Sequence, residues 1–281
     1  MATGSRIYIS PFDECAEEYD RVFTHSTIGQ AQRDSVWEEL GNTFHAGDRI
    51  LEIGCGTGVD ACHLAGHGVE VLACDSSPKM ITVAERRIKD SRRSELVRLR
   101  LLAAEEIASL QVERLFDGAF SNFGVLNCVR DLRTLAGNLA AFLRPGATAL
   151  LCWLGPFCLW ETVWYMTQKK PAKALRRRQG GATIARLDGG GLVTVYYPSI
   201  STLRGAFAPY FSIKGIKGIG VAVPPSYIEP HARQHPRLLN AAVLADSFLG
   251  RCPVARLLAD HILVRFERET GFATGHTLHR K

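Results

Sequence analysis

Short apolar runs alternate with stretches of helical periodicity through the first half of the chain. The runs that predict strands cover residues 49–53, 69–74, 96–102, 116–121 and 147–154. Between them, apolar residues recur at the helical spacing, most clearly over residues 132–143. Strands that alternate with helices predict an α/β fold with a doubly wound parallel sheet. The run at 96–102 alternates apolar and charged residues, which predicts an edge strand.

The pattern changes on both sides of this core. Residues 7–44 predict helices, and the second half predicts a sixth strand at 211–223, helices at 238–249 and 254–259, and a last strand at 261–268. A basic and then glycine-rich stretch, 169–191, predicts a mobile connection. We therefore expect one overall domain with five parts: an N-terminal helical cap (1–46), a nucleotide-binding core (47–155), a lid over the substrate site that includes the sixth strand (156–235), C-terminal helices with the last strand (236–269), and a flexible tail (270–281).

Composition narrows the class of protein. The chain has 281 residues, of which 46% are hydrophobic and 22% charged, as expected for a soluble globular protein. No run of 18 apolar residues predicts a membrane span, and the first ten residues lack the pattern of a signal peptide. Eight scattered cysteines, several in strand-like runs, predict buried thiols in a reducing cytoplasm. No C-x-x-C pair accompanies Cys55, Cys62, His63 and His67, so we predict no metal site.

The net charge of +6 leaves several partners open. A basic protein can take anionic substrates, contact anionic lipid surfaces peripherally, or bind nucleic acid, and the charge alone selects none of these.

The most informative stretch is Arg49–Gly58, which reads R-I-L-E-I-G-C-G-T-G. A glycine-rich turn from a strand into a helix lets the backbone approach a ligand and directs free N–H groups at it. A dinucleotide site requires G-x-G-x-x-G/A, but Val59 occupies the last position here. Glu52 would repel a pyrophosphate but could hold an ammonium or a hydroxyl. Asp75 ends the second strand, 23 residues after Glu52, where an acid can accept from both ribose hydroxyls.

This stretch resembles motif I of the class I S-adenosylmethionine-dependent methyltransferases, E/D-x-G-x-G-x-G. The segment D-S-S-P-K-M at 75–80 resembles the D-x-S-x-x-M of the quinone-type, small-molecule branch, and residues 12–20 resemble its F-D-x-x-A-x-x-Y-D opening. The resemblance implies a Rossmann-like sheet of seven strands, mostly parallel with the last antiparallel. It also implies S-adenosyl-L-methionine as cofactor and S-adenosyl-L-homocysteine as product. The cofactor contacts that it implies are Tyr19, Glu52, Gly54, Cys55, Gly56, Gly58, Asp75, Ser76, Met80, Ala104, Glu105 and Asn122.

The substrate site is less well defined. Aromatic residues follow the fifth strand, where this family builds its substrate pocket, and they suit a flat or hydrophobic acceptor. The predicted substrate contacts are Asn127, Trp153, Trp160 and Trp164. The motifs identify no general base, and the candidates are Tyr227, His231 and His235, since a histidine can titrate near neutrality.

The sequence thus favours a methyltransferase that acts on an aromatic, quinone-like or lipid-like small molecule. Methylation of RNA or protein, another reaction on the same fold, and a non-enzymatic binding module remain alternatives. Nucleic acid is the less favoured acceptor, because D/N-P-P-Y/F/W does not follow the fourth strand and V-P-P-S-Y occurs only at 223–227. The oligomeric state is open.

Overall fold

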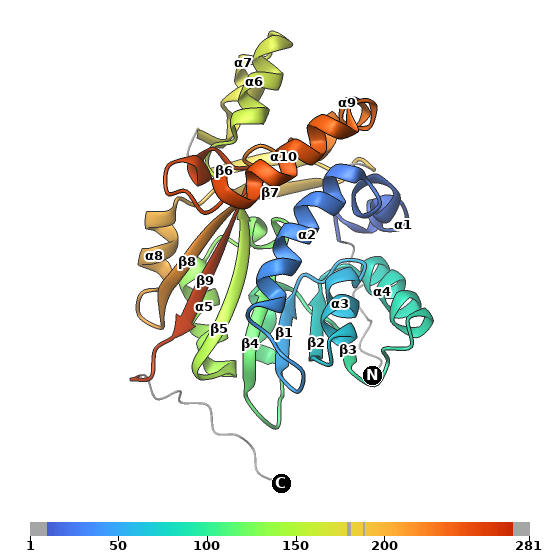
Figure 1. Cartoon of the computed structure of the whole chain (residues 1–281). Coiled ribbons are helices and arrows are strands. Elements are labelled where there is room, and N and C mark those ends of the chain that lie inside the picture. Colours follow the sequence, from blue (N-terminus) through green and yellow to red (C-terminus); the bar gives the residue numbers. More distant parts are fainter. Residues whose placement is uncertain (1–9, 179–180, 188, 272–281) are drawn as a thin grey trace, which may run out of the picture.

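A seven-stranded sheet forms the centre of the structure, a computed structural model that describes residues 10–178, 181–187 and 189–271 (Figure 1). Its strand order is β3-β2-β1-β4-β5-β9-β8. The first five strands in this order are parallel, and β9 is antiparallel to both of its neighbours. This confirms the predicted Rossmann-like sheet. The strands are β1 (Arg49–Ile53), β2 (Glu70–Asp75), β3 (Val97–Leu101), β4 (Phe116–Ser121), β5 (Leu143–Leu154), β8 (Phe211–Ile219) and β9 (His261–Arg268).

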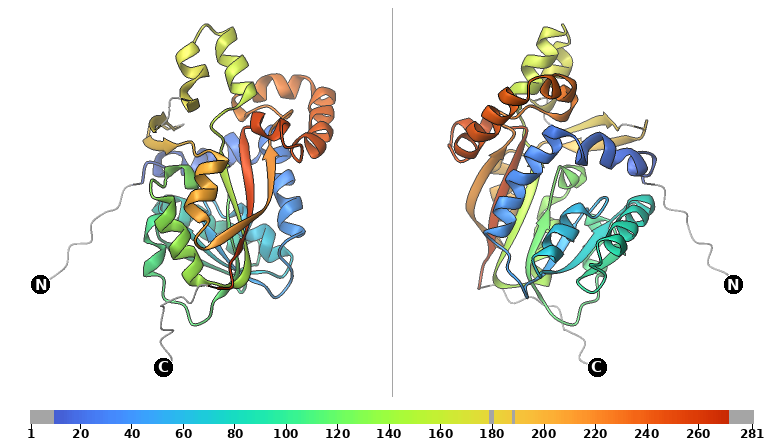
Figure 2. Two further views of the ribbon diagram at one scale, coloured as in Figure 1. Left: turned by 90° about the vertical axis from the view of Figure 1, so that its left-hand side faces the viewer. Right: turned by 45° about the vertical axis from the view of Figure 1, so that its right-hand side comes forward.

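Helices cover both faces of this sheet (Figure 2). One face packs against α2 (Thr27–Gly41), α3 (Val59–Gly66) and α4 (Pro78–Asp90), whose buried side chains include Leu40, Leu64 and Ile88. The other face packs against α5 (Leu132–Phe142) and α8 (Ile200–Phe207), with Leu139 and Phe207 in its core. Strands buried on both faces explain the continuous apolar runs of the sequence.

Local sequence signals set the ends of these elements. Ser77 caps α4 by accepting from the Met80 N–H at 3.1 Å, and Pro78 occupies the first helical position. Strand β3 is at the edge, as predicted. The segment Arg144–Gly146, whose proline and glycine would favour a helix stop, lies inside β5, because α5 ends at Phe142 and β5 begins at the next residue. The pairing of β5 with β4 then shifts register before Thr148.

The region after β5 is folded, which corrects the prediction of a mobile connection at 169–191. It contains α6 (Leu159–Thr167), α7 (Pro171–Ala174), η5 (Arg176–Arg178) and a hairpin of β6 (Ala182–Arg186) with β7 (Leu192–Tyr196). The buried Glu161 accepts from Arg176 and Arg177, and this ion pairing fixes the basic segment against α6. The chain continues after β8 through η6 (Ser226–Ile228), α9 (Glu229–Gln234), α10 (Pro236–Leu249) and η7 (Ala255–Leu258).

The N-terminal cap is helical, as predicted. It consists of η1 (Asp13–Cys15), α1 (Ala16–Tyr19), η2 (Asp20–Thr24) and α2. The expected flexible tail lies mostly outside the described residues, as do residues 1–9. Among the helices that are described, none has the length and apolar character to cross a bilayer.

Candidate cofactor and acceptor site

The glycine loop between β1 and α3 adopts the backbone that its sequence predicts. Gly54, Gly56 and Gly58 have φ values of +70°, +53° and +76°, a region in which residues with a Cβ are strained. A Cβ on Gly54 would lie 2.3 Å from Cγ1 of Val125, and one on Gly58 would lie 2.9 Å from Cβ of Ala84. A Cβ on Gly56 would meet nothing within 4 Å. The loop therefore packs tightly at both ends and is open in the middle.

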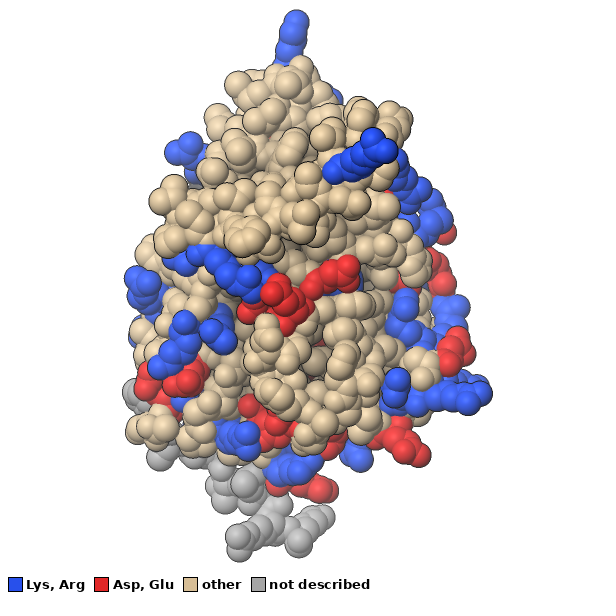
Figure 3. Space-filling model, viewed as in Figure 1, with Lys and Arg blue, Asp and Glu red and all other residues tan. Residues whose placement is uncertain are grey.

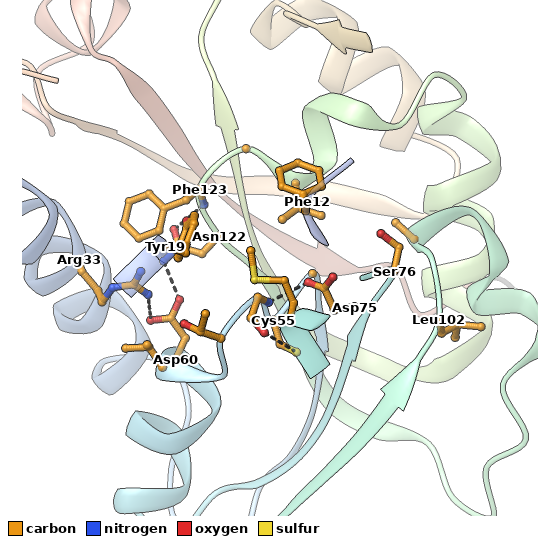
Figure 4. Close-up of a pocket in the computed structure, with 18 residues that line it drawn as sticks. Phe12, Tyr19, Arg33, Cys55, Asp60, Asp75, Ser76, Leu102, Asn122 and Phe123 are labelled. Atoms are coloured by element: carbon orange, nitrogen blue, oxygen red, sulfur yellow. Dashed lines mark hydrogen bonds and ion pairs between the residues drawn. The ribbon is translucent and has the colours of Figure 1, made fainter. Parts of the chain in front are cut away.

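A cavity lies over this open part of the loop (Figure 4). Its space, counted out to the mouth, is about 800 Å³. Nine of the twelve predicted cofactor contacts line it, namely Tyr19, Gly54, Cys55, Gly56, Asp75, Ser76, Met80, Ala104 and Asn122. Gly58 caps α3 behind the loop, and the side chain of Glu105 is exposed on η3 (Ala104–Ser109), so neither is on the cavity wall.

Asp75 holds the glycine loop from the end of β2. Its Oδ2 accepts from the Gly56 N–H and its Oδ1 from the Ser77 N–H, both at 2.8 Å. Burial raises the pKa of this carboxyl, although the backbone N–H groups act in the opposite direction. A carboxylate has about four acceptor positions, so Asp75 keeps acceptor capacity for a ligand while it orders the loop.

The opposite end of the cavity is lined by an ion pair that the sequence analysis missed. Arg33 Nη1 donates to Asp60 Oδ1 at 2.6 Å, and this oxygen also accepts from Trp37 Nε1 at 2.7 Å. Asn122 Nδ2 donates to the other oxygen at 3.0 Å. Burial alone would raise the pKa of Asp60, but Arg33 and these hydrogen bonds bring it below its usual value. The available signal was the spacing of Arg33 and Trp37, which puts both on one helix face.

Glu52 lies behind the loop rather than on the cavity wall, unlike the predicted direct contact. Only 2% of the residue is exposed, and its Oε2 is buried with no hydrogen-bond partner in the described part of the chain. Burial raises the pKa of Glu52 well above its usual value, and the negative charges of Asp60 and Asp75 raise it further. The buried site therefore favours the protonated form of this side chain, against the opposing effect of the Arg33 charge.

The N-terminal cap closes over the loop. Asp20 accepts from Thr57 Oγ1 at 2.8 Å and from the Arg87 guanidinium, while Arg87 Nε donates to the Thr57 carbonyl at 2.8 Å. Asp13 accepts from Ser77 Oγ at 2.5 Å. These contacts hold Phe12 and Tyr19 against the cavity, and burial raises the pKa of Tyr19 to about 12. The tyrosine is therefore a neutral hydroxyl at physiological pH.

A second cavity adjoins the first and extends to about 1330 Å³ with its open mouth. Phe12, Tyr19 and Phe123 line both cavities, so these three side chains form the junction between them. Much of the remaining wall is apolar and comes from the N-terminal cap and from η6. The residues there include Cys15, Val22, Phe23, Leu154, Pro225 and Tyr227.

A buried charge network forms the polar wall of this second cavity. Arg177 Nη2 lies 2.8 Å from Glu161 Oε2 and 2.7 Å from Asp260 Oδ1, and Arg176 Nε lies 2.9 Å from Glu161 Oε1. The next residue, His261, packs its ring edge-on to Phe123 with the centroids 5.5 Å apart. Burial lowers the pKa of His261, so the imidazole is neutral near pH 7.

The four predicted substrate contacts are structural side chains that line neither cavity. Trp153 is fully buried against Phe207 and Phe266, since it points into the core from β5. Asn127 is buried and its amide bonds Leu154 and Tyr196. The two tryptophans of α6 pack on α9 and the loop before it, where Trp160 Nε1 donates to the Ala222 carbonyl and Trp164 contacts Tyr227 and His231.

The candidate bases also need correction. His231 and His235 are exposed on α9 and at its end, outside both cavities, because that helix turns them to solvent. Tyr227 does line the second cavity, but burial raises its pKa, which disfavours a tyrosinate. Within the described residues, His261 is the histidine on the cavity wall, and its position at the start of an apolar strand gave no signal in the sequence. The same residues contain no cluster of His, Cys, Asp or Glu that could hold a metal ion.

Comparisons with known proteins agree with this geometry. Residues 51–149 match the family model of a methyltransferase domain. The demethylmenaquinone methyltransferase of Clavibacter sepedonicus is 32% identical over 50% of this chain and 55% of its own length. The tRNA 5-carboxymethoxyuridine methyltransferase of Escherichia coli K12 is 31% identical over 50% of this chain and 54% of its own length. The chain thus spans about half the length of these curated relatives.

Among solved structures, the CcbJ methyltransferase from Streptomyces caelestis superimposes with a TM-score of 0.60 over 94% of this chain and 100% of its own, at 16% identity. At 16% identity, this similarity shows a shared fold and carries no further information about activity. Taken with the family match, it identifies residues 51–149 as a methyltransferase domain of the S-adenosylmethionine-dependent class, which confirms the resemblance noted in the sequence.

Proposed function

We propose that this chain transfers a methyl group from S-adenosyl-L-methionine to a small acceptor that is aromatic, quinone-like or lipid-like. The observation that carries the proposal is the junction of two cavities at Phe12, Tyr19 and Phe123. One cavity has the features of a nucleotide site, and the other combines a mostly apolar surface with one wall of buried, paired charges. A transfer reaction requires two such sites in contact.

The first cavity fits the cofactor along its whole length. Met80, Leu102 and Ala104 give an apolar surface for the adenine, next to the carboxylate of Asp75 for the ribose hydroxyls. At the other end, Arg33 and Asp60 present one cation and one anion to the zwitterionic methionine part. The open space over Gly56 lies between them, where a side chain would intrude on the ligand.

The bound cofactor would supply a methyl group on a positively charged sulfur. The chain would hold the acceptor beside that methyl group and exclude water. Correct orientation alone can be worth effective molarities of about 10⁵–10⁸ M. The aromatic rings at the junction are suited to both tasks, because they are apolar and several are buried or half-buried. If the acceptor must lose a proton, the neutral imidazole of His261 is placed to receive it.

The first relative named above, a demethylmenaquinone methyltransferase, supports the quinone-like class. The tRNA methyltransferase among the relatives keeps RNA as the second candidate acceptor, and the positive net charge is compatible with it.

Isothermal titration with S-adenosylmethionine and S-adenosylhomocysteine, with NAD as the control ligand, tests the cofactor. We expect binding of both sulfur nucleotides and none of NAD. Asp75→Ala should weaken binding by roughly 10-fold or more, since a hydrogen bond to a charged group is worth about 1.5–3 kcal/mol. Asp90→Ala, at the exposed end of α4, is the matched control and should bind as the wild type does. Unchanged affinity in Asp75→Ala would remove the ribose assignment.

Transfer of a radiolabelled methyl group then tests the acceptor. Phenols, quinones with an open ring position and bulk transfer RNA are offered to the same preparation. Label in a quinone or phenol supports the small-acceptor proposal, whereas label only in RNA contradicts it and supports the second candidate. His261→Asn provides a further readout, because loss of a base lowers transfer at neutral pH more than at high pH.

A further inference from the structure

The end of the molecule that carries α6 and α10 exposes many large apolar side chains. Both helices pack on one small cluster around Ile28 and Val223, so they are neighbours above the sheet (Figure 1). We call their outer surface, with that of η7, the apolar face. It consists of Leu159, Val163, Met166, Leu238, Leu244, Phe248, Val254 and Leu257, each at least 40% exposed.

Helix α10 is apolar on two sides. Leu239, Ala242 and Asp246 lie on the side that faces the protein. Leu238, Leu244 and Phe248 lie on the outer side and are 68%, 68% and 78% exposed. An amphipathic helix of a folded protein normally turns charged residues outward. Here the outward side is apolar, and contiguous exposed apolar surface of this kind marks an interaction site.

The charge of the same region is strongly asymmetric. Residues 156–259 contain fourteen Lys and Arg against four Asp and Glu, so this part carries +10 and the rest of the chain −4. Of the described acids in this part, Glu161 and Asp246 are buried, and Glu229 accepts from Thr27, Ile28 and Arg233. Figure 3 shows that the upper part of the molecule is largely uncharged, with Lys and Arg at its top and flanks and most of the visible Asp and Glu at mid-height, at the right edge or below.

We propose that the apolar face binds the surface of an anionic lipid bilayer. Phe248 and the leucines of α10 would enter the acyl boundary, and the exposed Lys169, Lys170, Lys173 and Arg237 would contact the headgroups. The exposed cations beside the face favour an anionic partner over a second copy, because two faces with the same positive charges repel each other. RNA would neutralise the cations but would leave the leucines and Phe248 without an apolar partner.

The position of this face also suits the proposed function, on which this further point rests. The second cavity is lined by Glu161 of α6 and by Pro225, Ser226 and Tyr227, which precede α9. Tyr227 lies against α6, with its ring centroid 5.9 Å from that of Tyr165. Helix α6 thus borders the acceptor cavity and carries part of the apolar face, so an acceptor dissolved in a bilayer would have a short route to the cavity.

Sedimentation of the full chain with unilamellar vesicles tests the surface without requiring methyl transfer. Vesicles of phosphatidylcholine alone are compared with vesicles that also contain phosphatidylglycerol, at increasing NaCl. We expect binding to the anionic vesicles that weakens with salt. Leu244→Ser with Phe248→Ser should lower the partition constant by roughly 10-fold or more. Lys169→Gln with Lys170→Gln should lower it about 5-fold per charge removed.

Matched controls lie on the edge strand β3. Leu101→Ser removes a leucine that is 53% exposed, and Arg98→Gln with Arg100→Gln removes two exposed cations. These variants should bind vesicles as the wild type does. The proposal is overturned if anionic vesicles do not bind, or if the β3 variants lose as much binding as the others. It is also overturned if ultracentrifugation shows a dimer that Leu244→Ser with Phe248→Ser dissociates, which would make a second copy the occupant. Vesicle binding with a silent cofactor titration would retain this surface and reject the proposed function alone.

Discussion

Arg33 of α2 and Asp60 of α3 form an ion pair that joins the N-terminal cap to the glycine loop. The Nη1 and Oδ1 atoms are 2.6 Å apart, and each side chain is only 6% exposed. The guanidinium also lies over the ring of Phe123, 4.8 Å from its centroid. One pair of side chains therefore connects the cap, the first helix of the core and the junction of the two cavities.

Breaking this pair should destabilise the fold strongly. Arg33→Met leaves Asp60 buried without its cation, and removal of one partner of a buried pair costs about 3–5 kcal/mol. Urea unfolding followed by circular dichroism measures the free energy of unfolding. Arg86→Met removes the exposed pair with Glu17 and should cost at most about 1 kcal/mol.

The double variant Arg33→Met with Asp60→Asn should recover part of the loss, because no uncompensated charge is then buried. If the double variant loses as much free energy of unfolding as Arg33→Met and Asp60→Asn lose separately when added together, the two side chains act independently.

Glu52→Gln should change how stability depends on pH. The folded-state pKa of Glu52 lies well above the usual glutamate value of 4.5, so above pH 4.5 the native state holds a proton that the unfolded state releases. The wild type therefore loses stability as pH rises from 4.5 toward the folded pKa, and the glutamine removes this loss. Urea unfolding at pH 4.5 and pH 8 should show a gain for Glu52→Gln that is larger at pH 8. A gain that is equal at both pH values would mean that Glu52 is ionised in the folded state.

Much of the core was predictable because its signals are local. Capping at Ser77, the alternation over β3 and the glycines before α3 each depend on neighbouring residues, so they can be recognised without knowledge of the tertiary fold. The same locality explains why nine of the twelve predicted cofactor contacts line the first cavity, since ligands of such sheets gather at the carboxyl ends of the strands.

One end of the first cavity and the acceptor side were not predictable in the same way. Arg33 and Asp60, which line the first cavity, are 27 residues apart, and His261 reaches the second cavity only because β9 returns beside β5. Composition after the fifth strand indicated an aromatic pocket, yet Trp153 faces the core and Trp160 packs from α6 onto the cluster around Ile28 and Val223. Which side of an element faces inward depends on its tertiary partners. The basic segment at 169–178, which we predicted to be mobile, is held by the ion pair between Glu161 and Arg177. No sequence pattern indicated that these two residues are in contact.

Substitution by alanine should affect Gly54 and Gly56 of the glycine loop differently. Gly54→Ala must displace Val125, whose Cγ1 lies 2.3 Å from the new Cβ, so the variant should lose stability. Gly56→Ala has open space and should lose only about 1–2 kcal/mol from its positive φ. Its methyl group would, however, occupy the first cavity and should weaken S-adenosylmethionine binding by roughly 10-fold or more. Calorimetry and thermal unfolding of both variants separate the two effects, and a Gly56→Ala variant with wild-type affinity would place the cofactor elsewhere.

Asp20 should control how long the cap stays closed over the cofactor. It accepts from Thr57 in the glycine loop and from Arg87 of α4, while Glu17, one helical turn earlier, pairs with Arg86 at the surface. Asp20→Asn removes the negative charge that accepts hydrogen bonds from Thr57 and Arg87. A hydrogen bond to a charged group is worth about 1.5–3 kcal/mol, so we expect the cofactor to dissociate roughly 10-fold faster from this variant. Stopped-flow release of S-adenosylhomocysteine measures this rate.

Glu17→Gln is the matched control, because Glu17 also pairs with an arginine of α4 but does not contact the glycine loop. Its release rate should equal that of the wild type. Equal acceleration in both variants would mean that general electrostatics, and not the contact with the loop, retains the cofactor.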